Sequence, residues 1–145
     1  MLRRLVGGRM RGTAAREIAA AELERALARL CLEPVSAAWA ALVTTDGMVH
    51  ACFPSQGSIG RDRIAAMSAA TLSLGERISR ELSTDALDYA LIAGTDGATL
   101  VIALDAEHLL ALGLPRTLSL DATFEGVRLS AVPLLQMLGI TGLAV

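Results

Sequence analysis

Residues 59–82 read IGRDRIAAMSAATLSLGERISREL, and this stretch decides the fold that the sequence predicts. Its larger side chains recur every three or four residues, which is the spacing of one side of an α-helix. We expect this side of the helix to cover the core of the chain. It comprises Ile64, Met67, Thr71, Leu74, Ile78 and Leu82.

The same helix has a second side, which is made of small residues and carries almost no charge. It comprises Ala66, Ala69, Ala70 and Ser73, with Ala65 and Leu72 beside it. A helix side that faces water usually carries charged residues, but here the charged residues stand near the two ends of the stretch. We therefore expect this side to lie against a partner that approaches closely.

The composition agrees with a surface that is covered by another protein. The chain has 145 residues, which is the size of one domain, and 53% of them are hydrophobic while only 19% are charged. Such an apolar chain either enters a membrane or loses surface to a partner. No uninterrupted apolar run approaches the roughly 20 residues of a membrane-spanning helix. We therefore expect a protein partner and no membrane insertion.

The charge balance argues against a nucleic-acid partner. The net charge is −2, and the chain has one Trp, one Tyr and two Phe, so it offers neither a broad basic surface nor many rings for base stacking. Residues 1–12 are basic but lack the long apolar region of a secretory signal. We therefore expect a cytoplasmic protein, in which Cys31 and Cys52 are reduced core residues.

The rest of the chain divides into short elements. Thr13 is a plausible N-cap for a first helix over 14–32, with a buried stripe that includes Leu23 and Leu27, and Ser58 or Asp62 is a plausible N-cap for the long helix. The expected strands are 37–44, 48–53, 87–93, 99–104 and 108–114. A bent helix follows from about 121 to 138, where Pro133 either kinks it or begins a second short helix. We expect a tail at 1–12, a domain at 13–138 and a second tail at 139–145.

These elements predict an α+β fold in the order α-β-β-α-β-β-β-α. Asp-Gly turns at 46–47 and 96–97 indicate tight hairpins, and hairpins require antiparallel strands. Several strands are apolar on both faces, so helices must cover both sides of the sheet. The prediction is a five-stranded antiparallel sheet with helices on both faces.

The sequence shows no pattern that is typical of an active site. His50 and His108 have no metal-ligand partners at suitable spacing, no phosphate-binding loop motif occurs, and the chain contains no lysine. We therefore expect no enzyme activity, no cofactor and no metal. Arg61 and Arg63 could reach a partner's phosphates as an arginine finger does, although solvated charges at a helix end are the interpretation that we favour. Gly57 and Gly60, before the same helix, are only a weak sign of an anion site.

The run AAMSAATLSLGER at 65–77 stands between two strand–Thr-Asp-Gly–strand units. This arrangement resembles the Roadblock (dynein light chain) domain family, in its prokaryotic MglB-like branch, over roughly residues 14–114. The final segment departs from the family pattern, because Gly126 and Pro133 interrupt it.

The resemblance implies a profilin-like sandwich that forms a homodimer. In such a dimer the long second helices pack together and the strands at 87–93 join edge to edge. The implied interface residues are Ala66, Ala69, Ala70, Ser73, Leu87, Tyr89 and Leu91. The implied function is that of a non-catalytic adaptor or regulator of a Ras-like small GTPase, acting as an activator or a scaffold.

Two other functions stay open at this point. A small-ligand sensor with a profilin-like fold would show a cavity between sheet and helix. An enzyme that used Ser or Asp residues would show a polar cluster in a cleft. The aliphatic composition of the expected core favours close filling over a cavity.

Overall fold

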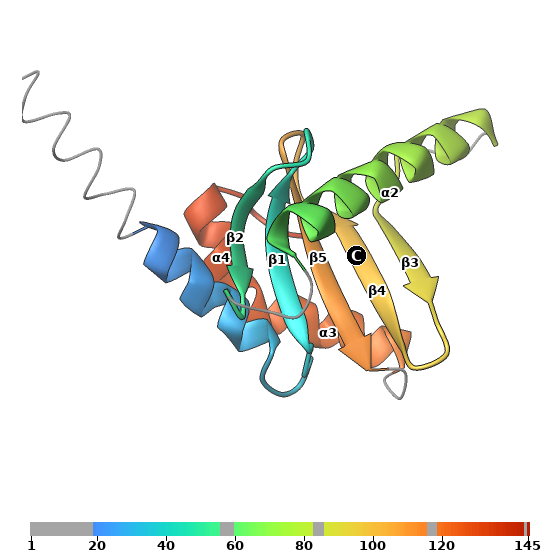
Figure 1. Ribbon diagram of the computed structural model, residues 1–145. Coiled ribbons are helices and arrows are strands. Elements are labelled where there is room, and N and C mark those ends of the chain that lie inside the picture. Colours follow the sequence, from blue (N-terminus) through green and yellow to red (C-terminus); the bar gives the residue numbers. More distant parts are fainter. Residues whose placement is uncertain (1–18, 56–59, 83–85, 116–118, 144) are drawn as a thin grey trace, which may run out of the picture.

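The structure is a computed structural model that describes residues 19–55, 60–82, 86–115, 119–143 and 145, and it contains one sheet between two layers of helices (Figure 1). An N-terminal helix over 19–30 precedes the sheet. The other elements are β1 (Trp39–Thr44), β2 (Val49–Phe53), α2 (Arg61–Glu81), β3 (Tyr89–Ala93), β4 (Gly97–Ala103), β5 (His108–Pro115), α3 (Leu120–Ser130) and α4 (Val132–Leu138). The predicted α+β class and element order are confirmed, with the last helix divided in two.

The sheet has five strands in the spatial order β2-β1-β5-β4-β3, and every neighbouring pair is antiparallel. β5 is central and almost fully buried, whereas β2 and β3 form the two edges. A register shift between Leu42 and Val43 leaves His50 of β2 as an extra residue, which is a β-bulge. The predicted five-stranded antiparallel sheet is therefore confirmed.

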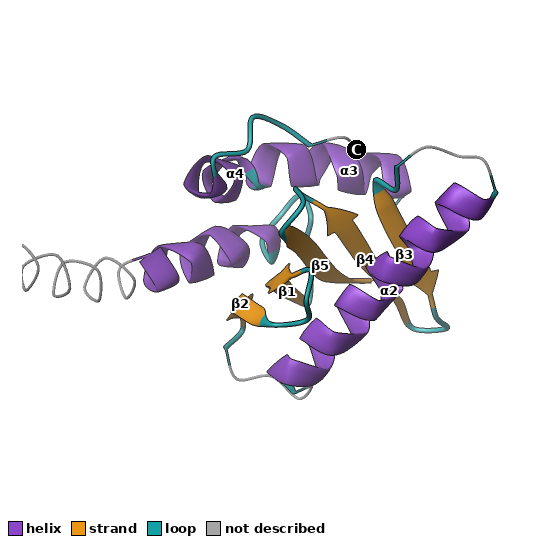
Figure 2. Ribbon diagram, turned by 90° about the horizontal axis from the view of Figure 1, so that it is seen from above, coloured by secondary structure: helices purple, strands orange, loops and turns teal. Residues whose placement is uncertain are grey.

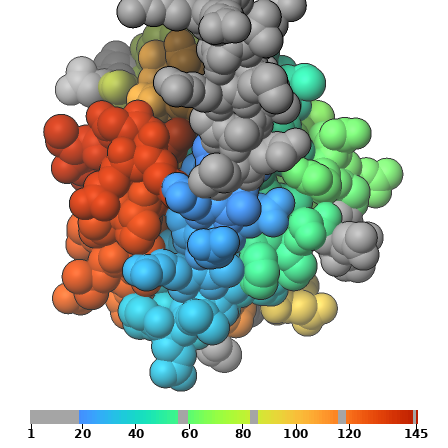
Figure 3. Space-filling view, turned by 90° about the vertical axis from the view of Figure 1, so that its left-hand side faces the viewer, coloured from blue at the N-terminus to red at the C-terminus, as the bar shows by residue number. Residues whose placement is uncertain are grey.

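Three helices cover one face of the sheet, which we call the back face. The N-terminal helix lies beside α3 and α4 on that face, and α2 lies on the opposite side of the sheet (Figures 2 and 3). Leu27 and Leu30 of the N-terminal helix are fully buried there, as are Val127 of α3 and Leu134 of α4. These side chains pack with alternate residues of the strands into the larger of two apolar clusters.

One helix, α2, crosses the other face, which we call the front face. The smaller apolar cluster lies beneath it and comprises Ala41, Val43, Cys52, Ala65, Leu72, Val101, Leu109 and Ala111. α2 runs diagonally over the strands, and its C-terminal end extends past the edge strand β3 (Figure 1). This overhang leaves part of the helix without a sheet beneath it.

The predicted core side of the long helix is wrong for most of its large residues, although Ile64 is half-buried and packs on the front-face cluster. The buried residues of α2 are Ala65, Ser68 and Leu72, whereas Met67, Leu74, Ile78 and Leu82 at its end are exposed. Ala65 and Ser68 are small, so the helix backbone can approach the flat sheet closely and gain dispersion contacts along its length. The larger side chains then point away from the sheet.

The expected ends of several elements also need correction. α2 begins after Gly60, which makes no side-chain cap hydrogen bond, and Asp62 lies within its first turn. β3 begins at Tyr89 instead of 87. The last segment is two helices, because Ala131 ends α3 and Pro133 stands in the first turn of α4, where its missing N–H costs no hydrogen bond.

Some predictions fall on residues that the structure does not describe. They are the N-cap Thr13, the start of the first helix at 14–18, the alternative cap Ser58, Gly57, and the tail at 1–12.

Candidate interaction surface

The exposed side of α2 carries an apolar stripe. Met67, Leu74 and Ile78 are 63%, 59% and 48% exposed. They lie at helical spacing, so they form one continuous surface along the helix. Single exposed apolar residues are normal, but a continuous apolar stripe marks a site of interaction.

The small residues predicted for the interface lie beside this stripe. Ala66, Ala70 and Ser73 are exposed. Ala69 is half-buried and packs against the front-face cluster of its own chain. Three of the four therefore border the apolar stripe, while Ala69 belongs partly to the core.

The three interface residues predicted around β3 have different surroundings. Leu87 precedes the strand and packs on α2, where a Cβ built on Gly75 would lie 2.6 Å from its side chain. The ring of Tyr89 makes an edge-to-face contact with Phe124 of α3, with 4.7 Å between the ring centroids. Leu91 is exposed. Of these three side chains only Leu91 is exposed, although the strand itself is an edge of the sheet.

The front face is open beyond the region that α2 covers. A shallow hollow of about 360 Å³ lies there, lined in part by Trp39, Ile92, Thr99 and Gly113. Trp39 lies directly over Gly113, where a Cβ would be 2.1 Å from the indole Nε1. Ile92 is 55% exposed. This end of the sheet therefore presents an apolar floor with an indole ring beside it.

Arg61 and Arg63 are exposed in the first turn of α2. No ion pair of either residue is present within the described part of the chain. A cation near a helix N-terminus is unfavourable for the helix, by about 0.3–1 kcal/mol. Helix stability therefore does not explain these two residues, and Arg63 lies four positions before Met67, on the side of the apolar stripe.

The two histidines are neighbours in space, which their sequence positions did not indicate. Their rings stack with 5.6 Å between the centroids, and Nδ1 of His108 lies 3.0 Å from Oδ1 of Asp105. The bulge at His50 accounts for the contact, since a bulge redirects a side chain. Within the described ranges, no group of three or more His, Cys, Asp or Glu side chains could hold a metal ion.

Two smaller observations concern the cysteines and the helices. Cys31 and Cys52 are free thiols, and burial raises the pKa of the Cys31 thiol. In the part of the chain that the structure describes, no helix is both long enough and apolar enough to cross a membrane.

Solved structures share this arrangement of sheet, helices and edges. MglB of Myxococcus xanthus matches with a TM-score of 0.72 and 12% identity, over 82% of this chain and 89% of its own. An MglB with a tetrameric arrangement matches with a TM-score of 0.64 and 19% identity, over 83% and 88%. A Roadblock/LC7 domain from Streptomyces avermitilis matches with a TM-score of 0.60 and 16% identity, over 70% and 86%.

The chain has a Roadblock-type, MglB-like fold. At the level of sequence, no protein-family model matches the chain and no curated protein matches it. The run at 65–77 resembles the Roadblock family in sequence, and the solved structures confirm that resemblance at the level of the fold.

Sequence reasoning missed the largest members of the exposed surface. The sequence predicts Met67, Leu74 and Ile78 as core residues, it leaves Trp39 as either a core or an interface aromatic, and it does not single out Ile92 within the strand at 87–93. The helical period was a correct signal, but it cannot say which of two apolar sides faces the sheet. Trp39, an aromatic residue at the start of a strand, was the one sign in the sequence of the front-face hollow.

Proposed function

We propose that the chain is a non-catalytic adaptor or regulator that self-associates through the exposed side of α2 and the edge of β3. The observation that carries this proposal is the apolar stripe of Met67, Leu74 and Ile78 on α2, the helix that covers the front face. Its occupant in this proposal is a second copy of the chain.

The shape of the front face supports self-association. β3 is an edge strand, and two such edges can pair about a twofold axis to give one continuous sheet. The C-terminal part of α2 that extends past β3 (Figure 1) would then lie over the sheet of the other copy. The open hollow beside Trp39 and Ile92 lies at the other end of β3, near the turn between β3 and β4. The proposed arrangement thus covers the edge strand and the overhang of α2.

The partner that we propose beyond self-association is a Ras-like small GTPase, with the chain acting as an activator or a scaffold. Support comes from the Roadblock-type fold and from the family resemblance in sequence, which implies this class of partner. Arg61 and Arg63 offer exposed positive charge, without an ion pair among the described residues, at one end of the α2 surface, where a phosphate or an acidic loop could be bound. We place this interaction in the cytoplasm, as expected from the sequence.

Self-association is tested by Ala70→Glu, with Ala122→Glu on the exposed side of α3 as the matched control. An unpaired charge buried in an interface costs about 3–5 kcal/mol, so Ala70→Glu should weaken association by more than about 100-fold. Sedimentation equilibrium measures this directly. A wild-type chain that stays monomeric at high concentration, or equal association of both variants, would contradict the proposed interface.

The GTPase partner is tested with Ras-like small GTPases of the native host, loaded with GDP or a GTP analogue. We expect binding that depends on the nucleotide and a loss of binding in an Arg61→Ala, Arg63→Ala double variant. Hydrolysis rates with and without the chain separate activation from scaffolding. Binding to no GTPase in either nucleotide state would remove this part of the proposal and leave self-association standing.

A further inference from the structure

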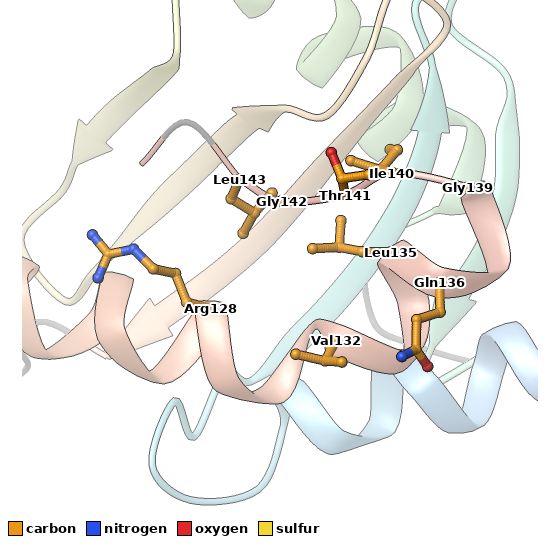
Figure 4. Close-up of a pocket in the computed structure, with 9 residues that line it drawn as sticks. All are labelled: Arg128, Val132, Leu135, Gln136, Gly139, Ile140, Thr141, Gly142 and Leu143. Atoms are coloured by element: carbon orange, nitrogen blue, oxygen red, sulfur yellow. The ribbon is translucent and has the colours of Figure 1, made fainter.

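A second hollow lies on the back-face side of the molecule, away from α2. It has a volume of about 680 Å³ and lies between α3, α4 and the segment 139–143 (Figure 4). Small-molecule sites in proteins usually measure about 300–1,000 Å³. The hollow is therefore large enough for a small ligand.

The turn at the end of α4 builds one wall of this hollow. Gly139 has a φ of +71°, which reverses the chain, and the amide of Ile140 donates to the carbonyl oxygen of Leu135. Ile140 and Leu143 then pack on the back-face cluster. Between them Gly142 contributes no side chain, and a Cβ there would meet no atom within 4 Å. The segment is thus held in place by Ile140 and Leu143, and the space around Gly142 between them is open.

The walls are partly aliphatic, with Gln136 and Thr141 as the uncharged polar residues and one charged residue. The apolar side chains are Val132, Leu135, Ile140 and Leu143, and the only charged lining residue is Arg128. Among the described residues, no Asp or Glu carboxylate forms an ion pair with Arg128. Its Nε donates to the main-chain oxygen of Val145, which does not line the hollow. An oxygen acceptor thus already lies against the guanidinium beside the hollow.

We propose that this hollow binds a monocarboxylate with an unbranched aliphatic chain. The carboxylate pairs with Arg128 in place of the Val145 oxygen, and the aliphatic chain lies against Val132, Leu135 and Leu143. A guanidinium donates strong, charge-assisted hydrogen bonds to a carboxylate, and burial of the aliphatic chain favours the exchange. Because the hollow and the exposed side of α2 lie on opposite faces of the sheet, ligand binding does not compete with self-association.

The test is calorimetric titration of sodium decanoate, below its micelle-forming concentration, into the full chain. We expect saturable binding, with amide chemical shifts in the ¹H–¹⁵N spectrum changing most at Thr141 and Gly142. Arg128→Gln should weaken decanoate binding by roughly tenfold or more, since it removes a hydrogen bond to a charged group. Decanol should bind more weakly than decanoate and should be insensitive to Arg128→Gln.

Two further variants keep the test decisive. Arg80→Gln makes the same charge change on α2 and should leave decanoate affinity unchanged. Gly142→Leu should fill the hollow and abolish binding without lowering the thermal unfolding temperature, because its Cβ meets no neighbour within 4 Å. Absence of saturable binding, equal losses in Arg128→Gln and Arg80→Gln, or shift changes centred on α2 would each overturn the proposal. The outcome is independent of any GTPase, so it can fail while the proposed function stands.

Discussion

The two faces of the sheet differ in how completely one chain covers them. On the back face three helices surround the large cluster, and side chains such as Leu27, Leu110 and Leu134 are wholly buried. On the front face a single helix covers a smaller cluster of eight residues and leaves large apolar side chains in water. The back face of the sheet is therefore covered by three helices of the same chain, although Leu129, Val132 and Met137 on the outer sides of those helices are exposed, whereas part of the front face is left open.

This difference indicates which apolar surface is buried by folding and which is left for association. Burial of apolar surface is the main driving force for both processes, at roughly 25 cal/mol per Å². On the back face, folding of one chain buries most of the apolar surface of the sheet. On the front face, apolar surface stays exposed after folding at Met67, Leu74, Ile78 and Ile92, and contact with another molecule could bury it.

The largest expected effect is a loss of stability when a buried side chain of the back face is shortened. Leu27→Ala should lower the free energy of unfolding by about 2–5 kcal/mol, because it removes buried methyl groups and leaves a cavity. Leu74→Ala is the matched change on the exposed side of α2. We expect it to lower stability only at protein concentrations where the chain associates. Urea denaturation at two protein concentrations checks both, and equal losses in the two variants would show that the faces are equivalent.

A smaller effect concerns the floor of the front-face hollow. Gly113→Ala should lower stability by about 1–3 kcal/mol, because the added Cβ would lie within 3 Å of the Trp39 indole and force the ring to move. Tryptophan fluorescence should shift as the ring becomes more exposed. Gly142→Ala serves as the control, since its Cβ meets no atom within 4 Å. Unchanged fluorescence in Gly113→Ala would mean that the ring is not held over this strand.

The two edge strands of the sheet, β3 and β2, can be compared for their effect on self-association. Ile92→Lys on β3 should weaken self-association by about 1–2 kcal/mol, because it removes apolar area and places a charge on the pairing edge. Phe53→Lys makes a similar change on β2, the other edge, and should leave association unaffected. Sedimentation velocity distinguishes the two. Loss of association only in Phe53→Lys would move the interface to β2.

The smallest expected effect is a pH dependence at the turn before β5. The pKa of Asp105 lies below its ordinary value of 3.8. Burial of the carboxyl raises this pKa. Hydrogen bonds from the amides of Glu107 and His108 and from the His108 side chain together lower it by more than burial raises it. A lowered pKa contributes stability above about pH 4, and this stability is lost as the pH falls below that value.

The Asp105 contribution should be less than about 1 kcal/mol, since the pair is partly solvated. Asp105→Asn should flatten the change in melting temperature between pH 7 and pH 3, and Asp96→Asn in the other hairpin turn controls for net charge. A wild-type profile that is as flat as that of Asp105→Asn would contradict the assignment.

Local sequence signals predicted the elements well, and their errors were local too. The Asp-Gly pairs at 46–47 and 96–97 indicated two hairpins, and both hairpins are present. Gly47 has a φ of 91°, which suits a tight turn. Gly97 is already the first residue of β4, so the second turn lies before it.

Of the two roles that the sequence left open for Pro133, a kink or the start of a second short helix, the structure has the second, because proline suits a first helical turn. Gly126 does not break α3. Its missing side chain makes room for Pro34 and Val35, which a Cβ would approach to 3.0 and 3.1 Å.

The sequence by itself determined that 59–82 forms a helix with two apolar sides and that the strands pair antiparallel, because side-chain period and turn residues act over a few positions. Only the tertiary structure decided the rotation of α2 about its own axis. That rotation depends on how closely Ala65 and Ser68 allow the backbone to approach the sheet, which is a property of two surfaces in contact. The same closeness turns Met67, Leu74 and Ile78 outward, so the candidate interaction surface results from packing.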